Sequence, residues 1–359
     1  MRWVRATAYA GKFETGAISP AVQHLEFLDG LRGVAALYIL LHHSCRLAFL
    51  TIATPKAFFF FGWGHAVVTI FIAISGYCLS LPVVRSGLTL KGGALHFYRK
   101  RARRILTPYY ASLAMGIMMF AFLTAPGHRL SIFTDSLNRK AIIAHLFMVH
   151  NWLPDVMFTI NGPLWSVAME MQIYMLFPLI VLGWKRFGTI WMLASTFLLS
   201  HLVFFLSGHR GPANYLFIFV LGAWAANLSP GKRNMVYLKS MFYICMIAFL
   251  ALPDIKDVYS DLLVGVGVSC MMAVCAQTTL FWPRSVLSLR FFTWLGGFSY
   301  SIYLIHSVLQ SIYLRMPWIP AGFPLLFFLL GIIPIILGVS YLFHMTIERP
   351  FMTVHTPRT

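Results

Sequence analysis

The stretch LDGLRGVAALYILLHHSCR, residues 28–46, contains the features that decide how this 359-residue chain folds. From Leu31 onward the residues are mostly apolar over 31–50, close to the roughly 20 residues that cross a bilayer core as a helix. Asp29 can cap the start of that helix, and Arg32 lies in its first turn. We therefore predict that 31–50 spans a membrane.

The composition extends this prediction to the whole chain. Hydrophobic residues make up 59% of the sequence and charged residues 11%, whereas roughly 25% of the residues in a soluble domain are charged. Disordered and ordinary soluble proteins are thereby excluded. Apolar runs near spanning length occur about ten times, at 31–50, 66–84, 105–123, 163–182, 190–207, 213–228, 236–252, 261–282, 291–314 and 323–343. We expect an all-α, polytopic transmembrane helical bundle.

The expected organisation is one membrane domain, 31–346, between an N-terminal tail, 1–30, and a short C-terminal tail, 347–359. An even number of spans places both termini on one side of the membrane. If that side is the cytoplasm, most of the 28 Lys and Arg residues lie in cytoplasmic segments, as the positive-inside rule requires. The N-terminal tail lacks the apolar core of a cleaved signal peptide. Both tails are therefore predicted to be cytoplasmic.

The formal net charge of +18 would suggest a nucleic-acid partner if the protein were soluble. Basic cytoplasmic loops account for it here, so the expected partner is the lipid bilayer and not nucleic acid. The five cysteines lie within apolar runs, and none has the C-x-x-C spacing of a zinc or redox site. We expect reduced cysteines and no bound metal.

His43 is the first candidate functional residue, because an ionisable group within a span is costly unless it faces a wet cavity or a partner. Arg32 and His43 are eleven residues apart, which places them on one helix face about 16 Å apart along the axis. The adjacent His42 points elsewhere, so His43 is the better candidate. A histidine that only bonds to a neighbouring helix is the alternative.

Glu170 is the acidic residue that lies deep in the span predicted over 163–182. Ser166, Glu170 and Tyr174 follow at four-residue intervals and form a polar stripe on one helix face. The carboxylate could orient a histidine, pair with an arginine, or hydrogen-bond to another helix. The sequence leaves these three roles open.

Two further polar segments have a structural and a functional interpretation. In the span over 291–314, Ser299, Tyr303, and His306 or Ser307 lie roughly on one side, where they could serve a site or only join helices. The segment FYRKRARRILTPYY has five basic residues in the six positions 99–104. Arginine pairs suit bidentate phosphate recognition, and a positive-inside anchor is the alternative.

The long loop predicted over 124–162 is expected on the external side. Its apolar stretch 141–149 is too short to span, which suggests a re-entrant or interfacial segment. His150 and Asp155 have the H-x4-D spacing of glycerolipid acyltransferases, but Pro154 lies between them and we interpret the spacing as coincidence. The chain lacks the G-x-S-x-G, P-loop, H-E-x-x-H and dinucleotide motifs, so hydrolase, ATPase, zinc protease and oxidoreductase functions have no support.

Several of these segments, taken in order, resemble the acyltransferase-3 family of integral membrane acyltransferases, which includes enzymes that O-acetylate O-antigen, exopolysaccharide and Nod factor. The resemblance covers nearly the whole membrane domain. Its motifs are R-x10-H at Arg32 and His43, the Ser75-Gly76-Tyr77 turn, R-x-x-R at Arg101 and Arg104, the segment with Trp165, Ser166 and Glu170, FSYSIYLIH ending at His306, and Glu348-Arg349-Pro350. Thr107 departs from the pattern, since a proline often precedes Pro108 in the family.

The resemblance implies an enzyme of the bacterial inner membrane that moves an acyl group, usually acetyl, from cytosolic acyl-CoA (acetyl-CoA) to a hydroxyl of a cell-surface or secreted carbohydrate. It implies that His43 is the catalytic base, with Glu170 as the second catalytic residue. Three arginines would hold the phosphates of CoA, namely Arg32, Arg101 and Arg104. The remaining candidates of the site are Ser75, Tyr77, Trp165, Ser166, Tyr303 and His306.

A proton-coupled transporter of a small solute or glycan precursor is the alternative function, because intramembrane His and Glu also suit such a carrier. The chain lacks the inverted repeat and paired broken helices that many transporters have. A sensor or scaffold would leave the ordered motifs unexplained. The sequence leaves open the acceptor, the acyl chain, and whether transfer is direct or passes through an acyl-enzyme.

Overall fold

The computed structural model describes residues 25–51, 62–123, 137–207, 212–228, 232–252, 257–313 and 328–352. These residues form helices and connecting turns, with no β-strand among them. The long helices are α1 (Glu26–Thr51), α3 (Gly64–Arg85), α4 (Gly93–Leu123), α6 (Leu164–Ser207), α7 (Pro212–Asn227), α8 (Lys232–Ala251), α9 (Asp257–Gln277), α12 (Ser299–Tyr313) and α14 (Ile333–Phe343). The all-α prediction is confirmed.

Shorter elements connect the long helices. They are α5 (Arg139–Leu146), the single turn η1 (His150–Trp152), α10 (Trp282–Leu287), α11 (Arg290–Gly297), the π-helical turns η2 (Phe328–Ile332) and η3 (His344–Glu348), and η4 (Arg349–Phe351). Most of the predicted N-terminal tail and the end of the predicted C-terminal tail lie outside the described residues.

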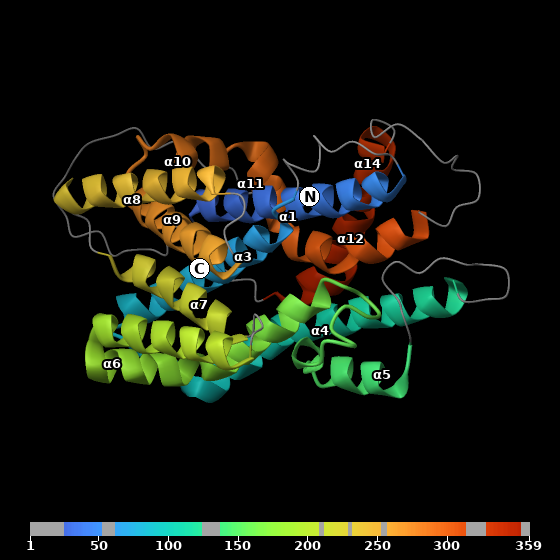
Figure 1. Cartoon of the computed structure of the whole chain (residues 1–359), viewed down its shortest axis with the longest axis horizontal. Helices are drawn as coiled ribbons and strands as arrows, with labels where there is room; N and C mark the ends of the chain where they lie inside the picture. The colour runs from blue at the N-terminus through green and yellow to red at the C-terminus, as the bar shows by residue number, and fades with distance from the viewer. Residues whose placement is uncertain are drawn as a thin grey trace, which may run out of the picture.

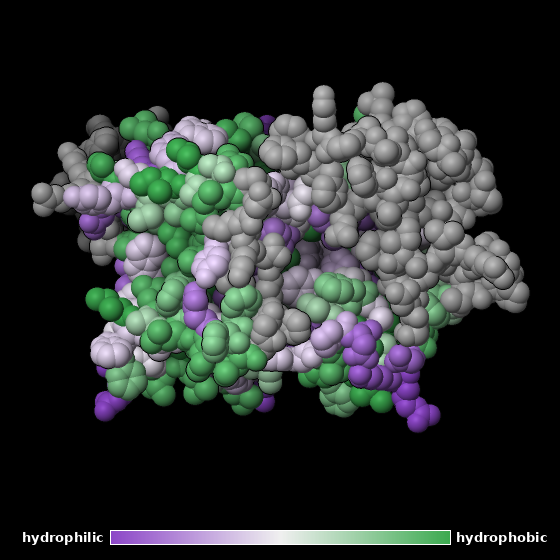
Figure 2. All heavy atoms as spheres, viewed as in Figure 1, coloured by the Kyte–Doolittle hydropathy of each residue, from purple (hydrophilic) through white to green (hydrophobic). Residues whose placement is uncertain are grey.

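Five helices of the described part are long and apolar enough to cross a membrane, within the bounds Gly64–Arg85, Leu164–Leu206, Asn234–Ala251, Tyr259–Gln277 and Leu330–Phe351. Large apolar side chains are exposed on these helices, for example Phe205 on α6 and Ile247 on α8. Figure 2 shows such hydrophobic side chains over much of the coloured surface on this face. A membrane protein is supported, while ten spans and cytoplasmic termini stay predictions.

Except for residue 163, the predicted spans 163–182 and 190–207 both fall within the bounds of α6, which contains a break in the helix. The backbone leaves helical geometry at Gly188, with φ 84° and ψ 173°. This left-handed φ suits glycine because a Cβ would clash with the backbone there. The helical segments on the two sides of Gly188 are therefore separate rods, as the two apolar runs predicted.

The predicted span 291–314 is instead two helices, α11 and α12, which meet at Phe298. Next to this break, α11 packs closely against the start of α1. A Cβ added at Gly296 would lie 1.9 Å from the carbonyl oxygen of Asp29, and one at Gly33 would lie 2.1 Å from that of Phe292. Only glycine allows these backbones to touch, which fixes the first turns of α1 beside α11.

Helix α3 lies between α1 and α7 in the middle of the bundle (Figure 1). The expected turn at Ser75-Gly76-Tyr77 is wrong, because these residues lie within the continuous helix α3. Gly76 serves close packing instead: a Cβ there would lie 1.9 Å from the Phe219 carbonyl oxygen on α7. This contact brings Ser75 of α3 to the same side of the bundle as the first half of α6.

Candidate active site

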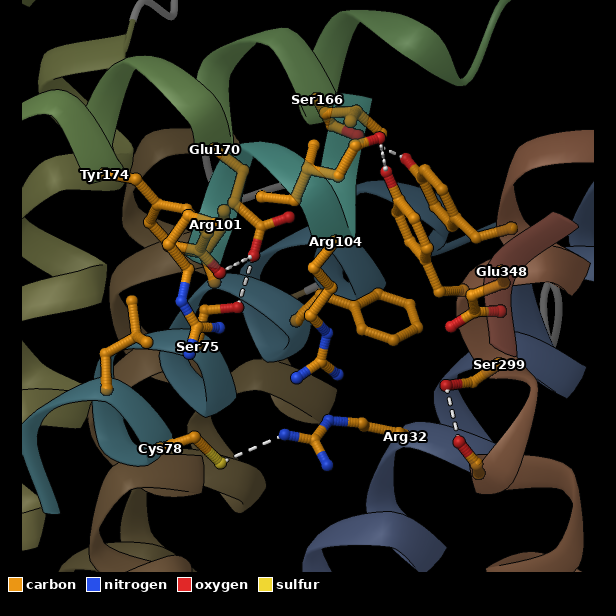
Figure 3. A pocket seen from close by; sticks show the side chains of 18 of the residues that line it. Arg32, Ser75, Cys78, Arg101, Arg104, Ser166, Glu170, Tyr174, Ser299 and Glu348 are labelled. Carbon is orange, nitrogen blue, oxygen red and sulfur yellow. Dashed lines mark hydrogen bonds between the residues drawn. The ribbon is translucent and has the colours of Figure 1, made fainter. Parts of the chain in front are cut away.

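A cavity of about 370 Å³ lies between α1, α3, α4, α6, α11 and α12. Glu348 and Met352, at the end of the described residues, also line it. Its volume is within the range of roughly 300–1,000 Å³ that is usual for small-molecule sites. We call it the arginine cavity. Its polar lining consists of Asp29, Arg32, Ser75, Cys78, Arg101, Arg104, Ser166, Glu170, Tyr174, Ser299, Tyr300, Tyr303 and Glu348 (Figure 3).

Arg32 is held in place by two neighbours. Its Nη1 donates to Asp29 Oδ1 at 2.8 Å, one helical turn earlier, and its Nη2 donates to Cys78 Sγ on α3 at 3.0 Å. The prediction of Asp29 as the helix cap is wrong, because α1 begins at Glu26; Asp29 lies within the first turn and is the counter-ion of Arg32. Part of the guanidinium remains directed at the cavity, as Figure 3 shows.

Arg101 and Arg104 lie three residues apart on α4, so both side chains reach the cavity from one helix face. Within the described residues, Arg104 has no hydrogen-bond or ion-pair partner, and the buried Nε of Arg101 has none either. Burial lowers the pKa of Arg101, since the charged form has lost water. Guanidinium donors without partners suit a multivalent anion such as a phosphate.

Glu170 contacts groups on the cavity wall and not a histidine. One of its oxygens, Oε1, accepts hydrogen bonds from the Ser75 hydroxyl and, at 2.5 Å, from the Tyr174 hydroxyl. Figure 3 shows Arg101 next to these three residues. Of the roles left open by the sequence, the structure gives Glu170 the hydrogen bond between helices, at a position inside the cavity.

His43 pairs with His306 of α12, and we call these two residues the histidine pair. Nδ1 of His43 and Nε2 of His306 are 2.8 Å apart, and the ring planes differ by 18°. Neither residue lines the arginine cavity. His42 points toward α3, where a Cβ added at Gly64 would lie 2.5 Å from its ring. The expectation that the adjacent histidines face different neighbours is thus confirmed.

Tyr303 connects the cavity to the histidine pair. Its hydroxyl and the Ser166 hydroxyl are 2.5 Å apart on the cavity wall. One turn later on α12, the His306 ring lies 6.0 Å from the Tyr303 ring, between centroids. The two predicted segments that contain Ser166 and Tyr303 therefore meet at the end of the cavity nearest the histidine pair.

Besides the histidine pair, two further candidates from the sequence lie outside the cavity lining. Tyr77 is buried in the core with 2% of its surface exposed, and Trp165 packs near Tyr215, with ring centroids 6.0 Å apart. Both positions indicate packing. The residues of the H-x4-D spacing likewise lie outside the cavity lining. Asp155 pairs with Lys140 at 2.6 Å, and burial lowers the pKa of His150 to about 3.

Glu348 is a cavity residue whose position the sequence did not predict. Its Oε2 accepts a hydrogen bond from Ser301 Oγ at 2.6 Å and one from His344 Nδ1 at 2.8 Å. The segment 347–352, expected as the start of a tail, therefore packs against the bundle, with Met352 also in the cavity lining. The only sequence signal was the Glu-Arg-Pro motif of the resembled family.

The described residues contain no group of three or more His, Cys, Asp or Glu side chains that could hold a metal ion. The arrangement offers instead a cavity rich in guanidinium donors and, one helical turn beyond its wall, a hydrogen-bonded imidazole pair. Such a combination can bind an anion and move a proton.

A family model described as an acyltransferase domain matches residues 25–345. Among curated proteins, O-acetyltransferase OatA of Staphylococcus aureus is 30% identical over 169 residues, which are 44% of this chain and 25% of that protein. The O-acetyl transferase of Shigella phage Sf6 is 30% identical over 155 residues, 41% of this chain and 43% of that protein.

Acyltransferase MdmB of Streptomyces mycarofaciens is 27% identical over 168 residues, 45% of this chain and 40% of that protein. The chain thus spans less than half the length of these curated relatives. No solved structure matches it.

Proposed function

Because the chain belongs to the acyltransferase-3 family, whose domain model matches residues 25–345, we propose that it is a membrane O-acyltransferase. It takes an acyl group, most simply acetyl, from cytosolic acyl-CoA and transfers it to a hydroxyl of a cell-surface or secreted carbohydrate. The observation that carries this proposal is the arginine cavity with the histidine pair one helical turn beyond its wall.

The donor binds through its phosphates. Arg101 and Arg104 present guanidinium groups without hydrogen-bond or ion-pair partners among the described residues, and Arg32 adds a third that Asp29 and Cys78 orient. Planar guanidinium groups form paired hydrogen bonds to phosphate oxygens. The basic segment that contains Arg101 and Arg104 belongs on the cytoplasmic side by the positive-inside rule, which is where acyl-CoA is available.

The chemical step is a direct exchange at the thioester. The acceptor hydroxyl gives its proton to the His43 imidazole while its oxygen bonds to the thioester carbonyl carbon. The carbon–sulfur bond then breaks, and the CoA thiolate takes the proton from the His43 imidazolium. The products are an oxygen ester and CoA thiol. A positioned general base accelerates such a step by about 10²–10⁴-fold.

Glu170 supports the donor site in this scheme and does not orient His43. Its carboxylate fixes the Ser75 and Tyr174 hydroxyls on the wall and offsets part of the positive charge near Arg101. Transfer to an oxygen atom is supported by the names of two relatives, which are O-acetyl transferases, and the carbohydrate acceptor follows from the resemblance to the family. Their bacterial and phage sources also favour the bacterial inner membrane.

The test is acyl-CoA consumption by membranes that contain the protein. We expect release of CoA thiol from acetyl-CoA, measured with a thiol reagent, when a matching glycan acceptor is supplied. This release should depend on His43. Membranes with a His43→Ala variant at equal expression are the control. Equal CoA release from both membranes would exclude His43 as the base.

Sidedness is tested by topology reporters fused after residues 95, 140 and 359. We expect them to report the cytoplasm, the outside and the cytoplasm. An external C-terminus would contradict the even number of spans and would reverse the side from which acyl-CoA enters.

A further inference from the structure

We propose that His306 is a positioning residue that holds His43 in the tautomer whose Nε2 accepts a proton. The inference rests on the proposed function, because His306 acts only through the base His43. It assigns a role to a residue that the sequence marked as a candidate without a task, and it replaces Glu170 as the group that orients the imidazole.

The geometry is that of a direct hydrogen bond between two rings. Nδ1 of His43 and Nε2 of His306 are 2.8 Å apart, and the planes are tilted by only 18°. A bond between ring nitrogens is strong when the rings are nearly coplanar, because the N–H then points along the other nitrogen's lone pair. The contact therefore has one donor and one acceptor.

The direction of this bond follows from the other nitrogen of His306. Its Nδ1 lies 2.9 Å from the carbonyl oxygen of Ile302, and a carbonyl oxygen can only accept, so Nδ1 carries the hydrogen. A neutral imidazole has a single N–H, which leaves Nε2 of His306 as an acceptor. His43 must then donate from Nδ1, so its own lone pair lies on Nε2.

His306 itself is unsuited to be the base. Its side chain is fully buried, with 0% of its surface exposed, and both of its nitrogens are used by the bonds to Ile302 and His43. His43 keeps partial exposure. The two imidazoles thus have different roles: His306 is fixed in the core, and His43 can contact a substrate.

A second contact, one turn along α12, fixes the register of the two helices. Gln310 Nε2 donates to the Leu40 carbonyl oxygen at 3.1 Å and to Ser44 Oγ at 2.8 Å. Gln310 and Ser44 are both buried. The packing of α12 on α1 thus includes hydrogen bonds besides the one between the two imidazoles. Gln310 also supplies a matched control.

The experiment compares four variants in the acetyl-CoA assay: His306→Leu, His306→Asn, His306→Gln and Gln310→Leu. The amide of glutamine can reach the position of Nε2 and accept from His43, whereas that of asparagine reaches only the position of Nδ1. Gln310→Leu removes hydrogen bonds between the same two helices without touching either imidazole. Thermal unfolding in detergent and acetyl-CoA binding report whether each variant is folded.

We expect His306→Leu and His306→Asn to lower kcat by about 10²-fold, the lower end of what a general base contributes, with the KM for acetyl-CoA unchanged. His306→Gln should recover at least a tenth of the parent kcat. Gln310→Leu should lose thermal stability and keep its kcat. If His306→Leu does not fold, the ratio of the glutamine to the asparagine variant decides, since both keep a polar side chain.

Either of two results in the His306 variants would overturn the positioning role: a parent-like kcat in folded His306→Leu or His306→Asn, or equal loss of kcat in the glutamine and asparagine variants. A fall of kcat in Gln310→Leu as large as in His306→Leu would also overturn it, because helix packing would then explain both. The His43→Ala variant separates this failure from that of the proposed function. If His43→Ala is active, the base assignment fails; if it is inactive while the His306 variants are normal, only the positioning role fails.

Discussion

Arg32 and His43 lie on one helix, α1, and their surroundings differ in almost every physical respect. Around Arg32 the arginine cavity is open and lined by charged groups of both signs. Beside His43 the two imidazoles of the histidine pair bond each other, and Gln310 of α12 bonds Ser44 of α1. One end has guanidinium donors directed at a cavity, and at the other end Nδ1 of His43 is bonded within the protein.

Donor binding and proton transfer, the two parts of the reaction, thus need different surroundings in a membrane protein. Binding a polyanionic donor needs positive charge that the protein does not neutralise itself. Proton transfer needs one nitrogen at a fixed position, so its neighbours must be satisfied and rigid. We expect substitutions at the cavity to change affinity and those at the histidine pair to change turnover.

The largest effect should come from the histidine pair. His43→Ala removes the base, and we expect transfer to fall by about 10²–10⁴-fold while expression and membrane insertion stay near normal. His42→Ala is the matched control, because the His42 ring lies against Gly64 of α3 and is not the ring that bonds His306. It should be much milder. The measurement is acetyl transfer per mole of protein in membranes, and similar losses in both variants would contradict the comparison.

The second effect concerns the cavity and should appear in affinity. Lysine keeps the charge of Arg101 and Arg104 but cannot form the paired hydrogen bonds of a guanidinium. Each charged hydrogen bond lost costs about 1.5–3 kcal/mol, so the double Arg→Lys variant should raise the KM for acetyl-CoA by at least about tenfold. Turnover at saturating donor should change little.

The control for this variant is Arg103→Lys, since Arg103 is exposed on the same helix and does not line the cavity. It should behave as the parent. An unchanged KM in the double variant would mean that the basic segment is only a membrane anchor.

The sequence predicted the residues of the arginine cavity better than the contact between His43 and His306. The reason is that these two histidines lie far apart along the chain. The R-x-x-R spacing and the stripe of Ser166, Glu170 and Tyr174 are local patterns on one helix each, so helical periodicity was enough to place them on one face. The partner of His43 lies 263 residues away. Periodicity within α1 carries no information about which distant helix packs there, and the sequence accordingly left the partner open.

The breaks in the helices were invisible for a similar reason. Counting apolar residues measures whether a segment prefers lipid, and it does not report backbone geometry. Hydropathy therefore could not show that 291–314 contains two helices meeting at Phe298. The close backbone contacts at Gly33 and Gly296, which lie near this break, can be found only from the positions of both helices. Glu348 was missed because the apolar run ends at 343.

A smaller effect is expected at Glu170, and it separates support from catalysis. Glutamine keeps an oxygen that can accept from Ser75 and Tyr174, and it removes only the charge. Glu170→Gln should therefore keep transfer within about tenfold of the parent, since each neutral hydrogen bond at stake contributes about 0.5–1.5 kcal/mol. Glu170→Ala should lose more, because two hydroxyls lose their acceptor. A glutamine variant as inactive as His43→Ala would restore Glu170 to the chemical step.

The smallest effect should come from Cys78, and it decides between direct transfer and an acyl-enzyme. The Cys78 thiol lines the cavity and accepts a hydrogen bond from Arg32, and a thiol beside a cation is the setting in which cysteine becomes a nucleophile.

In direct transfer the only role of the Cys78 thiol is that weak hydrogen bond, because sulfur is a poor acceptor and Asp29 still holds Arg32. Cys78→Ala should then raise the KM for acetyl-CoA roughly twofold, equivalent to about 0.5 kcal/mol, and leave kcat unchanged. If the acyl group instead passes through a Cys78 thioester, the same variant would lose turnover as completely as His43→Ala. Steady-state kinetics of the two variants, with a search for acyl-protein by mass spectrometry in the parent, distinguishes these outcomes.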